Sequence, residues 1–212
     1  MSIVIQNFKN IKSLIDNSNV KIIAVSKTFS YDVIKPLVEL GHNHFGENKV
    51  QEARSKWAEI KKEKPNINLH MIGKLQSNKA KDAIKLFDYI HSLDSQKLAD
   101  ILAKQENHLN KKLKYFIQVN VGNERQKSGI SINLLDDFYY YCTKDLKINI
   151  VGLMAIPPND SSQDIYFKKL MELNKLLGLS ELSMGMSSDF KTALKYETTF
   201  VRIGNMIFGN RY

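Results

Sequence analysis

A lysine at the end of an apolar run is the first residue here that could do chemistry. Lys27 lies in AVSKT (24–28), directly after Ile22 and Ile23. The period of two along a strand places Ile23, Val25 and Lys27 on one side, which presses the lysine toward the interior. Burial lowers the pKa of a lysine, and a neutral amine can form a Schiff base with a carbonyl. From these residues alone, a lysine that extends its amine into solvent is the favoured interpretation.

The stretch LSMGMSSDF (182–190) has the composition of a phosphate-binding turn. An apolar strand ends there, Gly185 allows close backbone approach, and we expect a helix to begin near Ser187 or Ser188. Free backbone N–H groups and the helix dipole would favour a phosphate at that point. A plain turn with Ser188 or Asp189 as helix cap explains the same residues equally well.

Three more side chains are candidates for ligand contacts. Arg202 lies inside the apolar run FVRIGN (200–205), and a buried guanidinium needs a partner, so we expect a ligand or a carboxylate beside it. Asn48 in HFGEN and His70 in NLHMIG could each hydrogen-bond a ligand ring. A hydrogen-bonded core histidine is a strong alternative for His70.

Other chemistries find less support in the sequence. His42 and His44 form an isolated pair without a spaced third ligand, so no metal site is expected. The formal charge of +9 invites a nucleic-acid interpretation, but only four of the 31 basic residues are arginine and the lysines are scattered. We therefore expect no nucleic-acid partner and a modest attraction for anions.

Strand-like runs alternate with amphipathic helical stretches along the whole chain. A first helix is expected from about Ile3 to Ile15, and each predicted strand except the last is followed by a helix. The predicted strands are 20–26, 42–46, 68–73, 88–93, 113–121, 148–156, 180–185 and 198–204.

This alternation requires parallel strands with helical crossovers. Eight such units predict an α/β fold, a (β/α)8 TIM barrel in one domain over residues 1–212 with an extra N-terminal helix, and an open doubly wound sheet is the second choice. In a barrel the polar strand ends would gather at one mouth, where such enzymes and binding proteins hold their ligands.

Composition also indicates where the protein works. Cys142 is the single cysteine, so no internal disulfide can form and a reducing, cytoplasmic setting fits. The N-terminal residues have neither a long apolar core nor a small-residue cleavage site. No run of about 18 apolar residues is present, and we expect no membrane partner.

Taken together, seven ordered motifs resemble one family. They are AVSKT (24–28), HFGEN (44–48), HMIGKLQSNK (70–79), QVNVGNERQKSG (118–129), GLMAIPP (152–158), LSMGMSSD (182–189) and VRIGNMIFG (201–209). The chain resembles, nearly end to end, the pyridoxal phosphate homeostasis proteins, which are related to the N-terminal barrel of bacterial alanine racemase.

The resemblance implies a TIM barrel that binds pyridoxal 5′-phosphate (PLP). Lys27 would carry the cofactor as a Schiff base, and Ser187 with the backbone around Gly204 would hold the phosphate. Arg202 would approach the pyridine nitrogen, and Asn48 and His70 would line the ring. The chain departs from the family at Asn205, where threonine is usual, and at Phe29, where a basic residue is frequent.

The same resemblance favours a binding protein over an enzyme. An arginine at the pyridine nitrogen makes PLP a weak electron sink. A racemase needs a second base, which alanine racemase takes from an added β domain, and this chain ends three residues after the last motif. We therefore expect no catalytic residues and a monomeric carrier of PLP that serves vitamin B6 and amino-acid balance, with apo-PLP enzymes as recipients. A minor amino-acid racemase is the alternative, and a basic nucleic-acid-binding barrel is remote.

Overall fold

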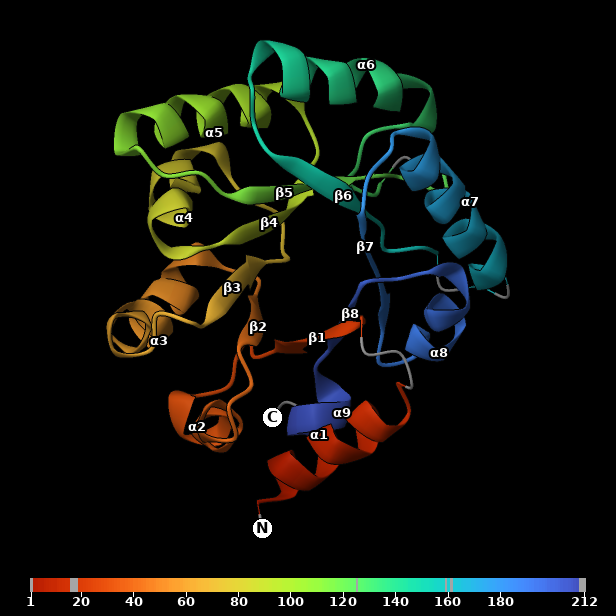
Figure 1. The fold of residues 1–212 in the computed structure, drawn as a ribbon. Helices are drawn as coiled ribbons and strands as arrows, with labels where there is room; N and C mark the ends of the chain where they lie inside the picture. The colour runs from red at the N-terminus through yellow and green to blue at the C-terminus, as the bar shows by residue number, and fades with distance from the viewer. Residues whose placement is uncertain (1, 16–18, 125, 159, 161, 210–212) are drawn as a thin grey trace.

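The computed structural model describes residues 2–15, 19–124, 126–158, 160 and 162–209, and within these ranges the chain forms a closed parallel barrel (Figure 1). The strands follow one another around the barrel in sequence order. They are β1 (Lys21–Val25), β2 (His44–Glu47), β3 (Asn68–Met71), β4 (Tyr89–Leu93), β5 (Lys114–Gln118), β6 (Ile150–Met154), β7 (Glu181–Met186) and β8 (Phe200–Ile203).

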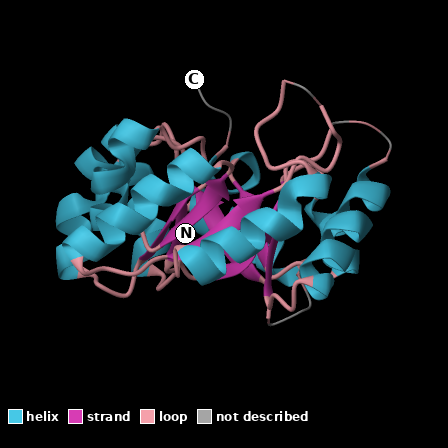
Figure 2. Cartoon of the chain, turned by 90° about the horizontal axis from the view of Figure 1, so that it is seen from above, coloured by secondary structure: helices cyan, strands magenta, loops and turns pink. Residues whose placement is uncertain are grey.

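Helices surround the strands on the outside, as Figure 2 shows in a second view. They are α1 (Ile3–Ser13), α2 (Tyr31–Glu39), α3 (Val50–Glu63), α4 (Ala80–Leu86), α5 (Gln96–Leu109), α6 (Leu135–Tyr140), α7 (Gln163–Leu176), α8 (Phe190–Ala193) and α9 (Asn205–Phe208). A 3₁₀ turn at Ser77–Lys79 leads into α4, and a π-helical turn at Tyr141–Asp145 extends α6.

Barrel closure confirms the (β/α)8 prediction and excludes the open doubly wound sheet. β1 pairs with β8 in parallel, with Ile23 opposite Arg202, so the sheet has no free edge between its first and last strands. One detail of the prediction is wrong, because β8 is followed by the short helix α9. This helix packs beside α1, where Asn7 Nδ2 donates to the backbone oxygen of Ile207 at 3.1 Å.

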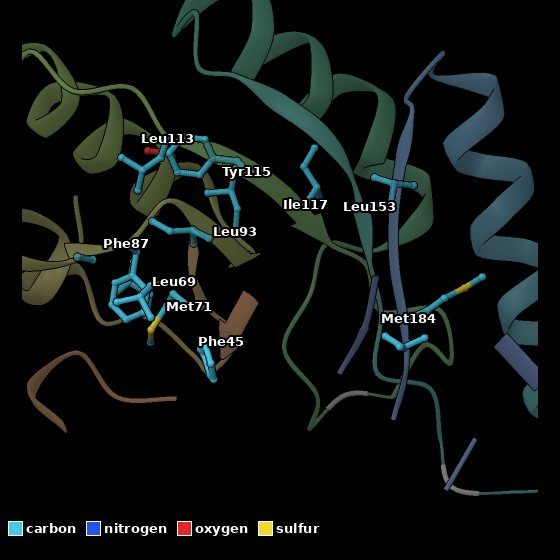
Figure 3. Close-up of a cluster of buried hydrophobic side chains, with 14 of the residues drawn as sticks. Phe45, Leu69, Met71, Phe87, Leu93, Leu113, Tyr115, Ile117, Leu153 and Met184 are labelled. Carbon is cyan, nitrogen blue, oxygen red and sulfur yellow. The ribbon is translucent and has the colours of Figure 1, made fainter. Parts of the chain in front are cut away.

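The alternation of side chains separates two apolar layers. Ile23 belongs to a small cluster inside the barrel, which contains Ile23, Tyr89, Phe116, Met154 and Phe200. Ile22 and Ala24 point the other way, into the larger core between barrel and helices. Figure 3 shows part of that outer core, including Phe45, Leu69, Phe87 and Tyr115. The predicted faces of β1 are therefore confirmed.

Helix α2 shows how local sequence ends an element. Pro36 lies within the helix and leaves the backbone oxygen of Asp32 without its i→i−4 donor, yet the helix continues to Glu39. Gly41 follows with φ +92°, and its N–H donates to Val38 O at 3.1 Å. Glycine adopts this left-handed conformation without strain, so the chain turns there toward β2. Across the described part of the chain, no helix has the length and apolar character needed to cross a membrane.

Gly152 on β6 is a position where the barrel tolerates no side chain. A Cβ added there would lie 1.9 Å from the backbone oxygen of Glu181 on β7 and 2.9 Å from Phe116 Cε1. We expect Gly152→Ala to lower the free energy of unfolding by about 3 kcal/mol or more, because the neighbouring strand cannot move alone. Denaturant unfolding checks this.

The matched control for Gly152 is Gly178→Ala. Gly178 has φ +65°, but a methyl group added there would meet open space, so its loss should be only the backbone cost of about 1 kcal/mol. Equal losses for the two variants would contradict the steric explanation.

Candidate functional site

A cavity of about 360 Å³ opens at the carboxyl ends of the strands. It is lined by Val25, Lys27, Asn48, Ile72, Ile156, Met186, Ser187, Ser188, Arg202, Gly204 and Asn205. Its size suits a small molecule. Five of the six residues predicted from the sequence as ligand contacts lie on this one cavity: Lys27, Asn48, Ser187, Arg202 and Gly204. Their contacts with a ligand remain predictions.

Lys27 is held by its two neighbouring peptide units. The ammonium of Lys56 on α3 donates to the backbone oxygen of Ser26 at 2.7 Å. The N–H of Thr28 donates to a carboxylate oxygen of Glu52, also on α3, and Thr28 has φ +70°. Because a threonine rarely adopts a positive φ, these contacts fix a turn that the chain would not keep by itself. The half-buried Lys27 therefore leaves β1 in a defined direction.

Glu47 at the end of β2 is the centre of this arrangement. Its carboxylate is fully buried, and Oε1 accepts from Ser26 Oγ at 2.7 Å, from Trp57 Nε1 at 2.9 Å and from Lys56 Nζ at 2.9 Å. A buried carboxylate is tolerated only when charge and hydrogen-bond partners compensate it. Sequence reasoning did not find this pair, although Glu47 lies in the HFGEN motif and Lys56 follows on the next helix.

Asn48 is positioned by the close approach of the β2 and β3 ends. A Cβ on Gly73 would lie 2.4 Å from the backbone oxygen of Asn48, so only glycine allows the two loops to touch. Asn48 Oδ1 is buried and has no hydrogen-bond partner among the described residues. A buried acceptor without a partner is costly unless a ligand supplies a donor.

The turn after β7 presents two serines to the cavity. Asp189 closes this turn, since its carboxylate accepts from Met186 N at 2.5 Å and its own N–H donates to Met186 O at 3.1 Å. Helix α8 begins at Phe190, later than the predicted start near Ser187 or Ser188, because Asp189 is used to close the turn. Ser187 is half-buried and Ser188 is exposed at the rim.

Arg202 faces the cavity from β8 and is 4% exposed. It donates through NH1 to Ser183 Oγ at 2.8 Å and through NH2 to the backbone oxygen of Ala155 at 2.9 Å. The protein partners of Arg202 are thus neutral oxygens. Within the described ranges no carboxylate forms an ion pair with it, although a carboxylate was one of the two expected partners, the other being a ligand. Burial lowers the pKa of Arg202 to about 10, and attraction to Asp189 opposes this shift.

His70 is the sixth residue predicted to contact a ligand, and that contact stays a prediction. It is fully buried inside the barrel and is not among the described residues that line the cavity. Its Nε2 is 2.9 Å from His44 Nδ1, and its Nδ1 is 2.9 Å from His91 Nε2. The alternative interpretation of His70 as a hydrogen-bonded core histidine describes this position. Within the described chain, no group of three or more His, Cys, Asp or Glu is arranged to hold a metal ion.

The fold and the site together define a single barrel of the alanine racemase N-terminal type. The family described as "Alanine racemase, N-terminal domain" matches residues 2–212. Curated relatives named pyridoxal phosphate homeostasis protein include one from Aquifex aeolicus, 38% identical with 90% of this chain and 87% of the relative covered. Another, from Vibrio alginolyticus, is 36% identical, with 100% and 99% covered. The chain belongs to the family of pyridoxal phosphate homeostasis proteins.

Solved structures agree with this assignment. PipY of Synechococcus elongatus, solved with PLP bound, is 33% identical with a TM-score of 0.89, covering 98% of this chain and all of that one. An alanine racemase of Clostridium difficile has a TM-score of 0.77 at 17% identity and shares the fold. The match covers 98% of this chain and 56% of the racemase.

The first test of the site concerns the buried Glu47–Lys56 pair, whose side chains are 0% and 7% exposed. Lys56→Met leaves an unpaired buried carboxylate, and we expect it to lower the free energy of unfolding by about 3–5 kcal/mol. The double variant Glu47→Gln with Lys56→Met removes that charge and should recover part of the loss. Denaturant unfolding measures both. A double variant less stable than Lys56→Met would contradict the electrostatic explanation.

The second test concerns pH. Burial lowers the pKa of His42 and of His44 from 6.5 to about 4, and lowers those of His70 and His91 well below 6.5. Between pH 6.5 and 4 the unfolded chain binds protons that the folded chain excludes, so the free energy of unfolding should fall as pH falls through this window.

Urea unfolding at pH 7 and pH 5 measures this dependence. Replacing His42 by Asn should make this dependence shallower by the share of one of the four histidines. Equal stability of the wild-type protein at pH 7 and pH 5 would show that the interior histidines do not exclude protons.

Proposed function

We propose that this protein binds PLP in the cavity at the carboxyl ends of the strands and carries or buffers it for vitamin B6 and amino-acid homeostasis. The observation that supports this most directly is the presence of Lys27, Ser187, Arg202 and Gly204 on one cavity. The names of the relatives and the PLP-bound structure of PipY point the same way.

The residues of the cavity fit the chemical groups of PLP. PLP supplies an aldehyde that condenses reversibly with a lysine amine, and Lys27 is the lysine on this cavity. Ser187 and the backbone at Gly204, where α9 begins, offer donors to the phosphate. The unsatisfied Oδ1 of Asn48 offers an acceptor to a polar group on the ring.

Arg202 determines how the bound ring behaves. A guanidinium has donors and no acceptor, so a pyridine nitrogen facing it accepts a hydrogen bond and carries no proton of its own. The ring then withdraws electrons weakly. This supports retention of the cofactor over turnover of amino acids.

The titratable groups on the cavity support the same proposal. Among the described lining residues, Lys27 and Arg202 are the ones that titrate, and a guanidinium is a poor proton acceptor at neutral pH. Racemisation needs a base on each face of the substrate, and Lys27 can supply one. We therefore propose little or no catalytic turnover.

Access to the cavity supports a role in delivery. Ser188 and Asn205 are exposed at its rim, so the bound ligand would remain open to solvent on that side. We propose apo-PLP enzymes as recipients, and we propose that the protein acts as a monomer in the cytoplasm. The single cysteine, Cys142, is buried, which suits a reducing compartment.

Lys27→Ala tests the assignment of the lysine. We expect the wild-type protein incubated with PLP and then with borohydride to carry one covalent PLP–lysine adduct at Lys27, detected by peptide mass spectrometry. Lys27→Ala should lose the adduct, since its cavity retains no lysine among the described residues. Lys74→Ala, at an exposed lysine outside the cavity lining, should retain it. An adduct of equal yield in Lys27→Ala would overturn the assignment.

Carrier and racemase are distinguished by turnover. The PLP-loaded protein is incubated with single L-amino acids, and D-isomers are measured by chiral chromatography. A carrier forms at most traces, whereas multiple turnovers per site that disappear in Lys27→Ala would favour the racemase.

A further inference from the structure

A continuous chain of hydrogen bonds runs through the barrel interior and ends at Arg202. His44 Nδ1 is 2.9 Å from His70 Nε2, and His70 Nδ1 is 2.9 Å from His91 Nε2. His91 Nδ1 is in turn 2.9 Å from Ser183 Oγ, which accepts from Arg202 NH1 at 2.8 Å. These links join strands β2, β3, β4, β7 and β8.

Burial decides which atoms carry the protons. Arg202 can only donate, so Ser183 Oγ accepts from it. Ser183 is fully buried, and in the described chain its hydroxyl has no hydrogen-bond acceptor other than His91 Nδ1. A buried O–H without an acceptor is costly, so the hydroxyl donates to His91.

The donor and acceptor nitrogens of each histidine ring follow in turn. A neutral imidazole has one donor and one acceptor nitrogen, so His91, accepting at Nδ1, donates from Nε2 to His70 Nδ1. His70 in turn donates from Nε2 to His44 Nδ1. All three rings are therefore Nε2–H tautomers. The donor and acceptor of every hydrogen bond in the series follow from Arg202, which can only donate.

Packing holds the rings in this alignment. His70 stacks on Tyr89 with ring centroids 4.3 Å apart, and His91 stacks on Phe116 at 4.2 Å. Both rings are fully buried, which favours the neutral form and lowers their pKa values. A rigid, neutral chain of this kind keeps Ser183 available as an acceptor.

We propose that Ser183, His91, His70 and His44 are positioning residues that fix the Arg202 guanidinium toward the cavity through one ordered set of tautomers. The effect of Arg202 on a bound PLP ring rests on the proposed function. The direction of the hydrogen bonds between the histidines does not. A substitution of Ser183 should therefore change the NMR signals of His44, which lies at the other end of the hydrogen-bonded series from Arg202.

The order of the chain is tested without any ligand. Long-range ¹H–¹⁵N spectra of the unliganded protein identify the protonated nitrogen of each histidine. We expect Nε2–H in His44, His70 and His91 at pH 7. Ser183→Ala should lower the Nε2–H preference of His91 by roughly fivefold, the effect of losing one buried hydrogen bond, and should also change the His44 signals. Ser183→Thr retains the hydroxyl and should restore both.

Met154→Leu is the matched control. Met154 lies opposite Ser183 in the β6–β7 register and inside the barrel, but among the described contacts it has no polar link to the chain of histidines. This variant should leave the tautomers unchanged. Nδ1–H in any of the three wild-type histidines would overturn the proposal, as would unchanged His44 signals in Ser183→Ala. The wild-type spectra identify the three tautomers even if Ser183→Ala does not fold.

The effect of the Ser183 variants on the cavity is measured through the affinity and the absorbance spectrum of bound PLP. Ser183→Ala should weaken PLP binding roughly fivefold and shift its absorbance maximum, Ser183→Thr should restore both, and Met154→Leu should change neither. Identical PLP affinity and spectrum in Ser183→Ala and wild type would overturn the positioning role. If the wild-type protein binds no PLP, the proposed function fails, while the tautomer spectra still decide the order of the chain.

Discussion

The site depends on the closure of the barrel between its first and last strands. The pairing of Ile23 with Arg202 and of Ala24 with Ile203 sets the register of that seam. Lys27 follows β1 by two residues and Gly204 follows β8 directly, so the seam brings together residues from opposite ends of the sequence. A slip of one residue would turn the alternating side chains to the other face and take Arg202 out of the interior.

A closed interior also limits which polar groups it can hold. Water cannot reach the packed layers of a barrel in quantity, so a charged side chain there needs protein partners. Two buried groups meet this demand differently, Glu47 between the barrel wall and α3, and Arg202 in the barrel interior. Glu47 collects donors from three side chains around one carboxylate oxygen, whereas Arg202 reaches its partners along a line of neutral side chains. The first arrangement fixes the turn that carries Lys27, and the second extends behind the cavity.

Much of this architecture follows from local patterns in the sequence. The alternation in β1 predicted the shared face of Ile23 and Val25 because strand geometry has a period of two, and the strand–helix alternation predicted the barrel. Lys27 itself lies beyond the end of β1, in a turn. The polar interior was harder to predict. His44, His70 and His91 each occupy an inward position, but only the register between strands shows that they contact one another. Helix α9 was missed because four residues carry too little periodicity to be distinguished from a loop.

The seam has a consequence for how the protein is made. Lys27 emerges in synthesis well before Ser187, Arg202 and Gly204. A truncated or partly assembled chain therefore contains Lys27 without the groups that surround the cavity. Since a ligand that contacts both sides of the seam binds only the closed form, its binding favours that form by mass action. Ligand occupancy would then report that the last strand has docked, which makes the site a marker of completed folding.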